Sequence, residues 1–157
     1  MKFKENVSNP IFSGALTLMQ SEPTVDHKEM LLGEILRAEF LMPVRLGSEP
    51  FLDEDGNKTV EEGTDAFFPM LANKEGQQFY MAFSNREELE KWPQYRDFVT
   101  MACNYLDYES ILTSKDANGR YNPGAGFVID PFGAKIVITK DMLANIMVRR
   151  DIAPPED

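Results

Sequence analysis

Nucleophilic catalysis in this 157-residue chain would need a general base beside Cys103 or beside a serine. The only cysteine is Cys103 and the only histidine is His27. A catalytic pair needs the thiol beside the imidazole. Cys103 lies in an apolar segment, where a thiol behaves as a small hydrophobic group, and His27 falls on the polar first turn of a predicted helix. No Gly-x-Ser-x-Gly motif occurs. We therefore expect a buried cysteine and a solvated histidine.

The segment "FLDEDGNKTVEE" (51–62) has the acidic spacing of part of a calcium loop. With Gly56 at the sixth position of an EF-hand loop, Asp53, Asp55 and Glu62 fall at the third, fifth and twelfth. Phe51 would then occupy the first position, and it cannot bind a cation. A hairpin with an Asp-Gly turn fits better, and we expect no metal there.

Phosphate binding has one weak candidate, "YNPGAG" (121–126), which lacks the Gly-Lys-Ser/Thr ending of a phosphate loop. This segment also enters a predicted strand, whereas a phosphate loop leaves a strand for a helix. We expect no cofactor.

Carboxylates remain as groups for acid–base chemistry or small-molecule binding, for example Asp97, Asp107 and Asp130. A deep pocket holding a carboxylate of raised pKa would favour that function. An apolar surface without such a group would favour a binding module.

Composition excludes several partners. The chain carries 16 basic and 26 acidic residues, a net charge of −10, so its average field repels nucleic acid and anionic membranes. The beginning lacks the apolar core of a secretory signal, and no apolar run is long enough to span a bilayer. With a lone cysteine, these features predict a cytoplasmic protein.

The helices and strands that would position these residues can also be predicted from the sequence. They form one domain over residues 1–150, followed by a loose tail at 151–157. Ser8 or Asn9 caps a first predicted helix, and Thr24 caps a second that carries an apolar stripe. Strands are predicted at 40–46, 66–72 and 78–84, and Pro43 and Pro69 indicate edge positions or a bulge. The segment 97–103 fits either strand or helix, and residues 104–114 a helix.

Ser84 and Glu87 have the spacing of a capping box, which predicts a short helix ending near Trp92-Pro93.

The stretch "GFVIDPFGAKIVITKDML" (126–143) predicts a β-hairpin at 126–138 followed by a C-terminal helix capped by Thr139. Asp130, Pro131 and Gly133 favour a type I turn, and we expect Gly133 to take positive φ in a three-residue bulged loop. Both flanking runs are apolar throughout, so the hairpin should lie near the sheet centre.

The order of these features resembles the N-terminal domain of the SseB family, from about Leu31 to Met147. The matching motifs are a helix leading into "FLMPV", "FYMAFSN" before "REELEKW", and "GFVIDPFG" before a capped helix. The resemblance implies an α/β (α+β) domain, with a mixed sheet of about five or six strands flanked by helices. The family is named after an enhanced-serine-sensitivity phenotype, and it supplies no reaction, cofactor or catalytic residue. Longer members continue into a further domain, whose function we do not expect here.

Two functions stay open. We favour a non-enzymatic domain that binds a protein or peptide through an apolar patch or a sheet edge. Phe132 at the turn tip, Trp92 at a helix end and Asp130 beside the turn are the candidate partner-binding residues. The alternative is the small-molecule binder or enzyme that uses the acidic residues.

Overall fold

The computed structural model describes residues 2–152, and side chains as far as Ile146. The α-helices are α1 (Pro10–Ser21), α2 (Val25–Arg37), α3 (Arg86–Leu89), α4 (Tyr105–Leu112) and α5 (Lys140–Ile152), with a 3-10 helix η1 at Tyr95–Asp97. The strands are β1 (Lys2–Phe3), β2 (Phe40–Leu46), β3 (Phe51–Leu52), β4 (Lys58–Thr59), β5 (Ala66–Phe67), β6 (Met70–Ala72), β7 (Gln78–Ala82), β8 (Val99–Cys103), β9 (Gly126–Ile129) and β10 (Ile136–Thr139). The α/β class, the late hairpin and the helix after it are therefore confirmed.

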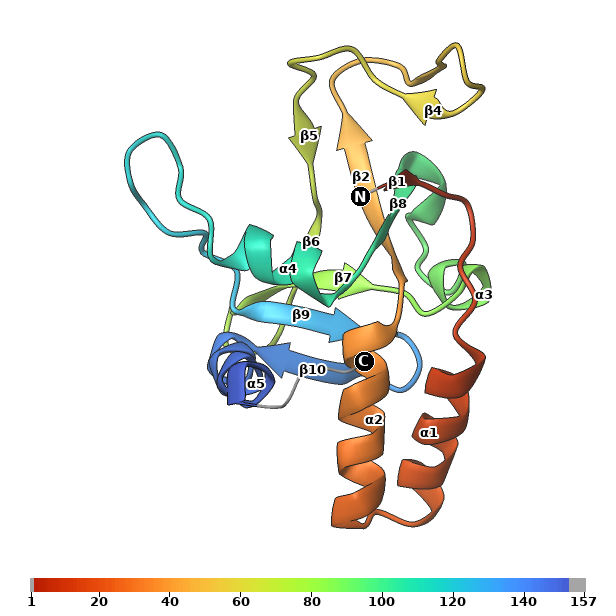
Figure 1. The fold of residues 1–157 in the computed structure, drawn as a ribbon. Helices are drawn as coiled ribbons and strands as arrows, with labels where there is room; N and C mark the ends of the chain where they lie inside the picture. Colours follow the sequence, from red (N-terminus) through yellow and green to blue (C-terminus); the bar gives the residue numbers. More distant parts are fainter. Residues whose placement is uncertain (1, 153–157) are drawn as a thin grey trace.

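The strands form two four-stranded sheets rather than one, in the orders β1-β8-β2-β5 and β10-β9-β7-β6 (Figure 1). The second sheet is mixed, because β7 runs parallel to β9 and antiparallel to β6. A bridge between Leu41 and Phe83 joins the two sheets, with N···O distances of 2.8 and 2.9 Å. A small two-stranded sheet, β3-β4, confirms the hairpin predicted around Gly56, whose φ is 79°.

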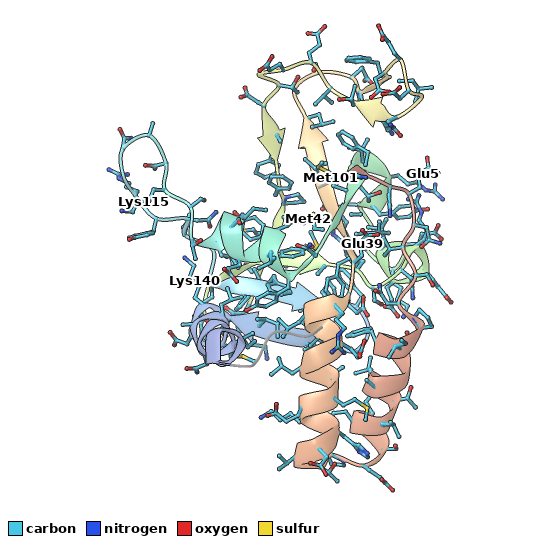
Figure 2. The ribbon with its side chains drawn as sticks, viewed as in Figure 1. Glu5, Glu39, Met42, Met101, Lys115 and Lys140 are labelled. Atoms are coloured by element: carbon cyan, nitrogen blue, oxygen red, sulfur yellow. The ribbon has the colours of Figure 1, made fainter. Side chains whose placement is uncertain are left out.

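Successive side chains along these strands point to opposite faces of the sheets, as the period of two in a strand requires. Each face packs into a separate buried cluster. Phe40, Met42, Tyr80 and Ala82 belong to the larger cluster, which α1, α2, α4 and α5 cover. Figure 2 shows Met42 beside Met101 of the paired strand β8. The intervening residues, among them Leu41 and Phe83, enter a second cluster with Leu89 and Trp92.

The helix boundaries follow the predicted capping residues in three cases. Asn9 precedes α1 with Pro10 at its first position, and the Thr24 hydroxyl accepts from the His27 N–H at 3.1 Å. Thr139 caps α5 by accepting from the Met142 N–H at 3.2 Å. None of the described helices has the length and apolar content of a membrane span. The tail predicted at 151–157 is not tested, because residues 153–157 lie outside the described part and α5 runs to Ile152.

The edge position predicted from Pro43 is wrong, because β2 lies between β8 and β5. The Lys4 N–H donates to the Thr100 carbonyl at 3.2 Å, so Thr100, which pairs with Pro43, directs its backbone groups away from β2. In an antiparallel pair of this kind the proline nitrogen also points away from its partner, and no ladder bond is lost. The single strand predicted at 66–72 is wrong, because Pro69 separates two short strands, β5 and β6, that belong to different sheets. Both are edge strands, as Pro69 indicated.

The prediction that Ser84 caps the short helix is also wrong. Asn85 is the N-cap of α3, and its side chain accepts from the Glu88 N–H at 2.8 Å. Ser84 points inward instead and hydrogen-bonds to Asp130. The ambiguous segment before residue 104 forms strand β8, and Tyr105, Tyr108 and Leu112 are buried on one side of α4 as expected.

The hairpin pairs Ile136 with Ile129, but its loop has six residues, 130–135. Positive φ occurs at Asp130 (49°) and Lys135 (53°), and Gly133 does not have it, so the predicted bulged loop is wrong. The Asp130 carbonyl accepts from both the Gly133 and the Lys135 N–H groups at 2.9 Å. Strand β9 is interior as expected, whereas β10 is an edge strand whose Val137 is exposed.

Candidate functional site

The turn after β9 is fixed by a buried carboxylate rather than by glycine conformation. Asp130 is only 3% exposed, and its two carboxylate oxygens accept from the Ser84 N–H at 2.8 Å and the Ser84 hydroxyl at 2.6 Å. The Asp130 N–H donates to the Ala82 carbonyl at 2.8 Å. These bonds tie the end of β7 to the start of the turn, which explains why Asp130 tolerates left-handed backbone.

A second carboxylate, from Glu88 of α3, supports the same turn. Glu88 Oε1 accepts from Lys91 Nζ at 2.7 Å, while Oε2 is buried with no hydrogen-bond partner among the described residues. A β-carbon added to Gly133 would lie 2.7 Å from Glu88 Oε2. A larger residue at position 133 would therefore force the Glu88 carboxylate to shift.

The pKa of Asp130 is raised, chiefly because burial penalises the charged form, and the nearby Glu88 adds to the rise. The two hydrogen bonds from Ser84 and the charge of Lys91 oppose it. A raised pKa satisfies half of the criterion for a pocket carboxylate. The other half is not met at the two cavities described below, because Asp130 lines neither of them.

The three candidate aspartates occupy three unconnected positions. Asp107 completes a capping box with Asn104 at the start of α4, and its Oδ2 accepts from the Asn104 N–H at 2.9 Å. Asp97 is exposed in η1. Each carboxylate thus has a local setting of its own, and the structure assembles no shared acid–base centre from them.

The two candidate aromatic residues differ in exposure. Trp92 is only 4% exposed and lies between Phe83, at a ring-centroid distance of 6.4 Å, and Phe98, at 5.0 Å. Its predicted exposure is wrong, because the chain after α3 folds this ring into the second core cluster. Phe132 is 43% exposed, as expected for a turn tip, and its role in binding stays a prediction. Pro131 is half-buried.

Cys103 is fully buried, and its Sγ lies 3.9 Å from Met42 Sδ. Burial raises the pKa of this thiol to about 12, so it is protonated and unreactive at neutral pH. His27 is partly exposed, and its Nδ1 lies 2.6 Å from the Glu22 carbonyl in the α1–α2 connection. The expectation of an inert cysteine is consistent with these positions.

An apolar groove with a volume of about 350 Å³ lies on the surface of the molecule. We call it the β10 groove. Strand β10 contributes Ile136 and Ile138, and the helices α1, α2 and α5 contribute the remaining lining residues, Met19, Lys28, Glu29, Leu31, Leu32, Ile35, Met142, Asn145 and Ile146. The groove therefore lies between α2 and α5 along the edge strand of the second sheet (Figure 1).

The β10 groove was not predicted as such from the sequence. The apolar stripes of α2 and α5 and the isoleucines of β10 were each recognised as core-facing. Their periodicity does not reveal that α2 and α5 leave a gap between them, because that spacing depends on how α1 and α2 pack together as a pair. Met142 was predicted to lie on the buried stripe of α5, and this prediction is wrong, because its side chain is exposed. Met147, on the same predicted stripe, lies outside the described side chains.

Residues 51–62 form the β3-β4 hairpin, with Asp53 Oδ1 accepting from the N–H groups of Asp55 and Asn57 at 3.0 and 2.9 Å. The Asp53 carboxylate is thus used in the turn itself. No group of three or more potential metal-binding side chains occurs among the described residues.

Comparison with known proteins gives one positive result. Neither the curated proteins nor the solved structures include a match to this chain. The family model of the SseB protein N-terminal domain matches residues 13–145, which is most of the sequence and includes α2, the strands of both four-stranded sheets except β1, and the beginning of α5. The chain belongs to the SseB N-terminal domain family.

Proposed function

We propose that this domain is a non-enzymatic binding module whose β10 groove docks an amphipathic segment of a partner protein. The observation that carries the proposal is the groove itself, an apolar concavity of about 350 Å³ beside an edge strand. This volume lies near the lower end of the range for ligand pockets and has room for a few apolar side chains.

The groove offers the geometry of helix-in-groove recognition. Its floor is an edge strand and its walls are two helices, so an inserted segment would contact apolar side chains on three sides. Met19 and Met142 line the groove from α1 and α5, and flexible methionine side chains adapt to different apolar surfaces. Binding energy would come from burying leucine-type or aromatic residues between Leu32 and Met142.

Charge selects the partner. Lys28 and Glu29 both line the groove, so the local charges balance and the net charge of −10 sets the sign of the long-range field. A second copy of this chain would bring −10 against −10, and an anionic membrane would be repelled in the same way. We therefore commit to a partner segment with an apolar face and flanking lysine or arginine residues.

The alternative function, an enzyme or small-molecule binder that uses acidic residues, is supported by the raised pKa of Asp130. Both oxygens of that carboxylate are already occupied by Ser84, and the group does not line the groove. We place the protein in the cytoplasm, an inference supported by the single cysteine, which can form no intramolecular disulfide.

The experiment is a nuclear magnetic resonance titration with designed peptides. A leucine–lysine peptide with helical apolar periodicity should shift the methyl signals of Ile136, Ile138 and Ile146 in a saturable way. A leucine–glutamate peptide of the same pattern and a leucine–lysine peptide of scrambled order should bind at least tenfold more weakly. Equal affinity for the scrambled peptide, or shifts away from the groove, would contradict the proposal.

A further inference from the structure

A polar cavity on another part of the molecule is lined mainly by positively charged side chains, although the chain as a whole is acidic. The cavity has a volume of about 420 Å³ and lies between β1, the β3-β4 hairpin, the start of α3 and β8. Lys4, Lys58 and Arg86 line it, with Glu5 as the one carboxylate among the lining residues. A ratio of three cations to one anion is the reverse of the balance in the whole chain, which has 16 basic and 26 acidic residues.

The three cations come from distant segments of the sequence and are brought together by the fold. Lys4 follows β1, which pairs with β8 through Phe3 and Met101. Lys58 lies on β4, whose hairpin forms one wall of the cavity, and Arg86 begins α3 on another. The backbone N–H of Arg86 donates to Asn6 Oδ1 at 2.8 Å, and this bond holds the start of α3 against the segment after β1.

These cations are available to a ligand at little cost. Lys58 has no ion-pair or hydrogen-bond partner for its ammonium group among the described residues. Arg86 Nε lies 3.3 Å from Glu90 Oε1 and Lys4 Nζ lies 2.8 Å from Glu39 Oε1, and both pairs are solvent-exposed. Arg86 Nη1 also donates to the Glu5 carbonyl at 3.2 Å, which holds the guanidinium beside another lining residue of the cavity. Exposed pairs contribute about 0–1 kcal/mol, so an incoming anion can replace them.

The cavity also has an apolar part. Phe3, Leu52 and Phe98 line it, and Leu52 is 70% exposed. The Arg45 guanidinium carbon lies 4.6 Å from the centre of the Phe98 ring, although Arg45 itself does not line the cavity. Figure 2 shows Glu5, the one carboxylate of the lining, on the outer segment of chain that follows β1.

We propose that this cavity is a binding site for a small organic oxyanion, a phosphate or carboxylate attached to an apolar body. Lys58 and Arg86 supply the charge, and the guanidinium of Arg86 has the planar geometry that matches phosphate and carboxylate oxygens. The apolar body of the ligand packs against Phe3 and Phe98. The site is separate from the β10 groove, because the two share no lining residue.

The test uses three probes with the same ring, namely phenyl phosphate, benzoate and benzylammonium, at low salt with detection by amide chemical shifts. Phenyl phosphate should give saturable shifts at Gly56, Asn57 and Thr100, and benzoate should bind at the same place more weakly because it carries less charge. Benzylammonium should give none. The two oxyanion arms distinguish a phosphate from a carboxylate source of the ligand.

Lys58→Glu should weaken phenyl phosphate binding at least tenfold. The matched control is Lys74→Glu, which makes the same charge change on an exposed turn that does not line the cavity and should alter binding by less than about twofold. Arg86→Gln, which removes the charge without reversing it, should give an intermediate loss. Equal weakening by Lys58→Glu and Lys74→Glu, equal binding of benzylammonium, or no saturable shift would overturn the proposal.

Discussion

At the scale of single residues, the turn after β9 shows how two carboxylates shape a loop. The Asp130 carboxylate takes both hydrogen bonds that Ser84 can donate, and the Glu88 carboxylate fills the space beside Gly133. Sequence patterns placed a turn at residues 130–133 correctly, but they predicted neither its six-residue loop nor the absence of positive φ at Gly133. They could not show that Ser84, 46 positions earlier, is the partner of Asp130, because that pairing depends on β7 and β9 running parallel.

Gly133→Ala should lower the free energy of unfolding by about 1 kcal/mol, because the added methyl group must displace Glu88 Oε2. The loss should become smaller in a Glu88→Ala background, where the space is open. Gly14→Ala is the control, since its β-carbon meets nothing within 4 Å inside helix α1, and alanine should stabilise there by up to about 1 kcal/mol. Chemical denaturation measures all four variants. An undiminished loss in the Glu88→Ala background would contradict this explanation.

The raised pKa of Asp130 predicts a pH dependence of stability. Because the folded state favours the neutral carboxyl group, its contribution is greatest at low pH and is lost as the pH rises through the folded-state pKa. The unfolding free energy of the wild type minus that of Asp130→Asn should therefore fall between acidic and neutral pH. Ser84→Ala should raise the pKa of Asp130 further, as read from its carboxyl carbon signal. A difference that grows with pH would show that the Ser84 bonds outweigh burial.

At the scale of elements, the second core cluster connects α3 to both sheets. Trp92 follows α3 and stacks between Phe83, after β7, and Phe98, before β8. A tryptophan at a helix end before a proline can be either exposed or buried. The burial of Trp92 could therefore not be predicted from its position before Pro93. The direction taken by the chain after the helix decides the outcome, and that direction is set by contacts with strands β7 and β8.

Trp92→Ala should lower the unfolding free energy by roughly 3–5 kcal/mol, as expected for deletion of a large buried aromatic side chain. Phe132→Ala should change it by less than about 1 kcal/mol, since this ring is 43% exposed. Thermal and denaturant unfolding of the two variants gives the comparison. Similar losses at both positions would mean that the turn tip is packed more tightly than the structure shows.

At the scale of the whole molecule, the order and type of the helices and strands could be predicted from the sequence. Which elements lie next to one another in space could be predicted less well. Apolar periodicity and capping residues located α1, α2, α4 and the β9–β10 pair, because these depend on residues close together in the chain. Pro43 was misplaced because the effect of a proline depends on which side of its strand is paired. The cation cavity was missed because Lys4, Lys58 and Arg86 are far apart in sequence, and the β10 groove because it is a gap between packed helices.

The β10 groove carries the proposed function, and a pair of methionine variants tests it most directly. Met142 lines the groove at 39% exposure, and Met30 of α2 is 47% exposed without lining it. Glutamine replaces methionine with nearly the same size and helix propensity, so neither change should disturb the fold. The measurement is the dissociation constant of the amphipathic leucine–lysine peptide for each variant, by calorimetry. We expect Met142→Gln to raise it about tenfold, about 1.4 kcal/mol, and Met30→Gln to leave it within about twofold. Equal effects of the two substitutions, or none at Met142, would contradict docking in the groove.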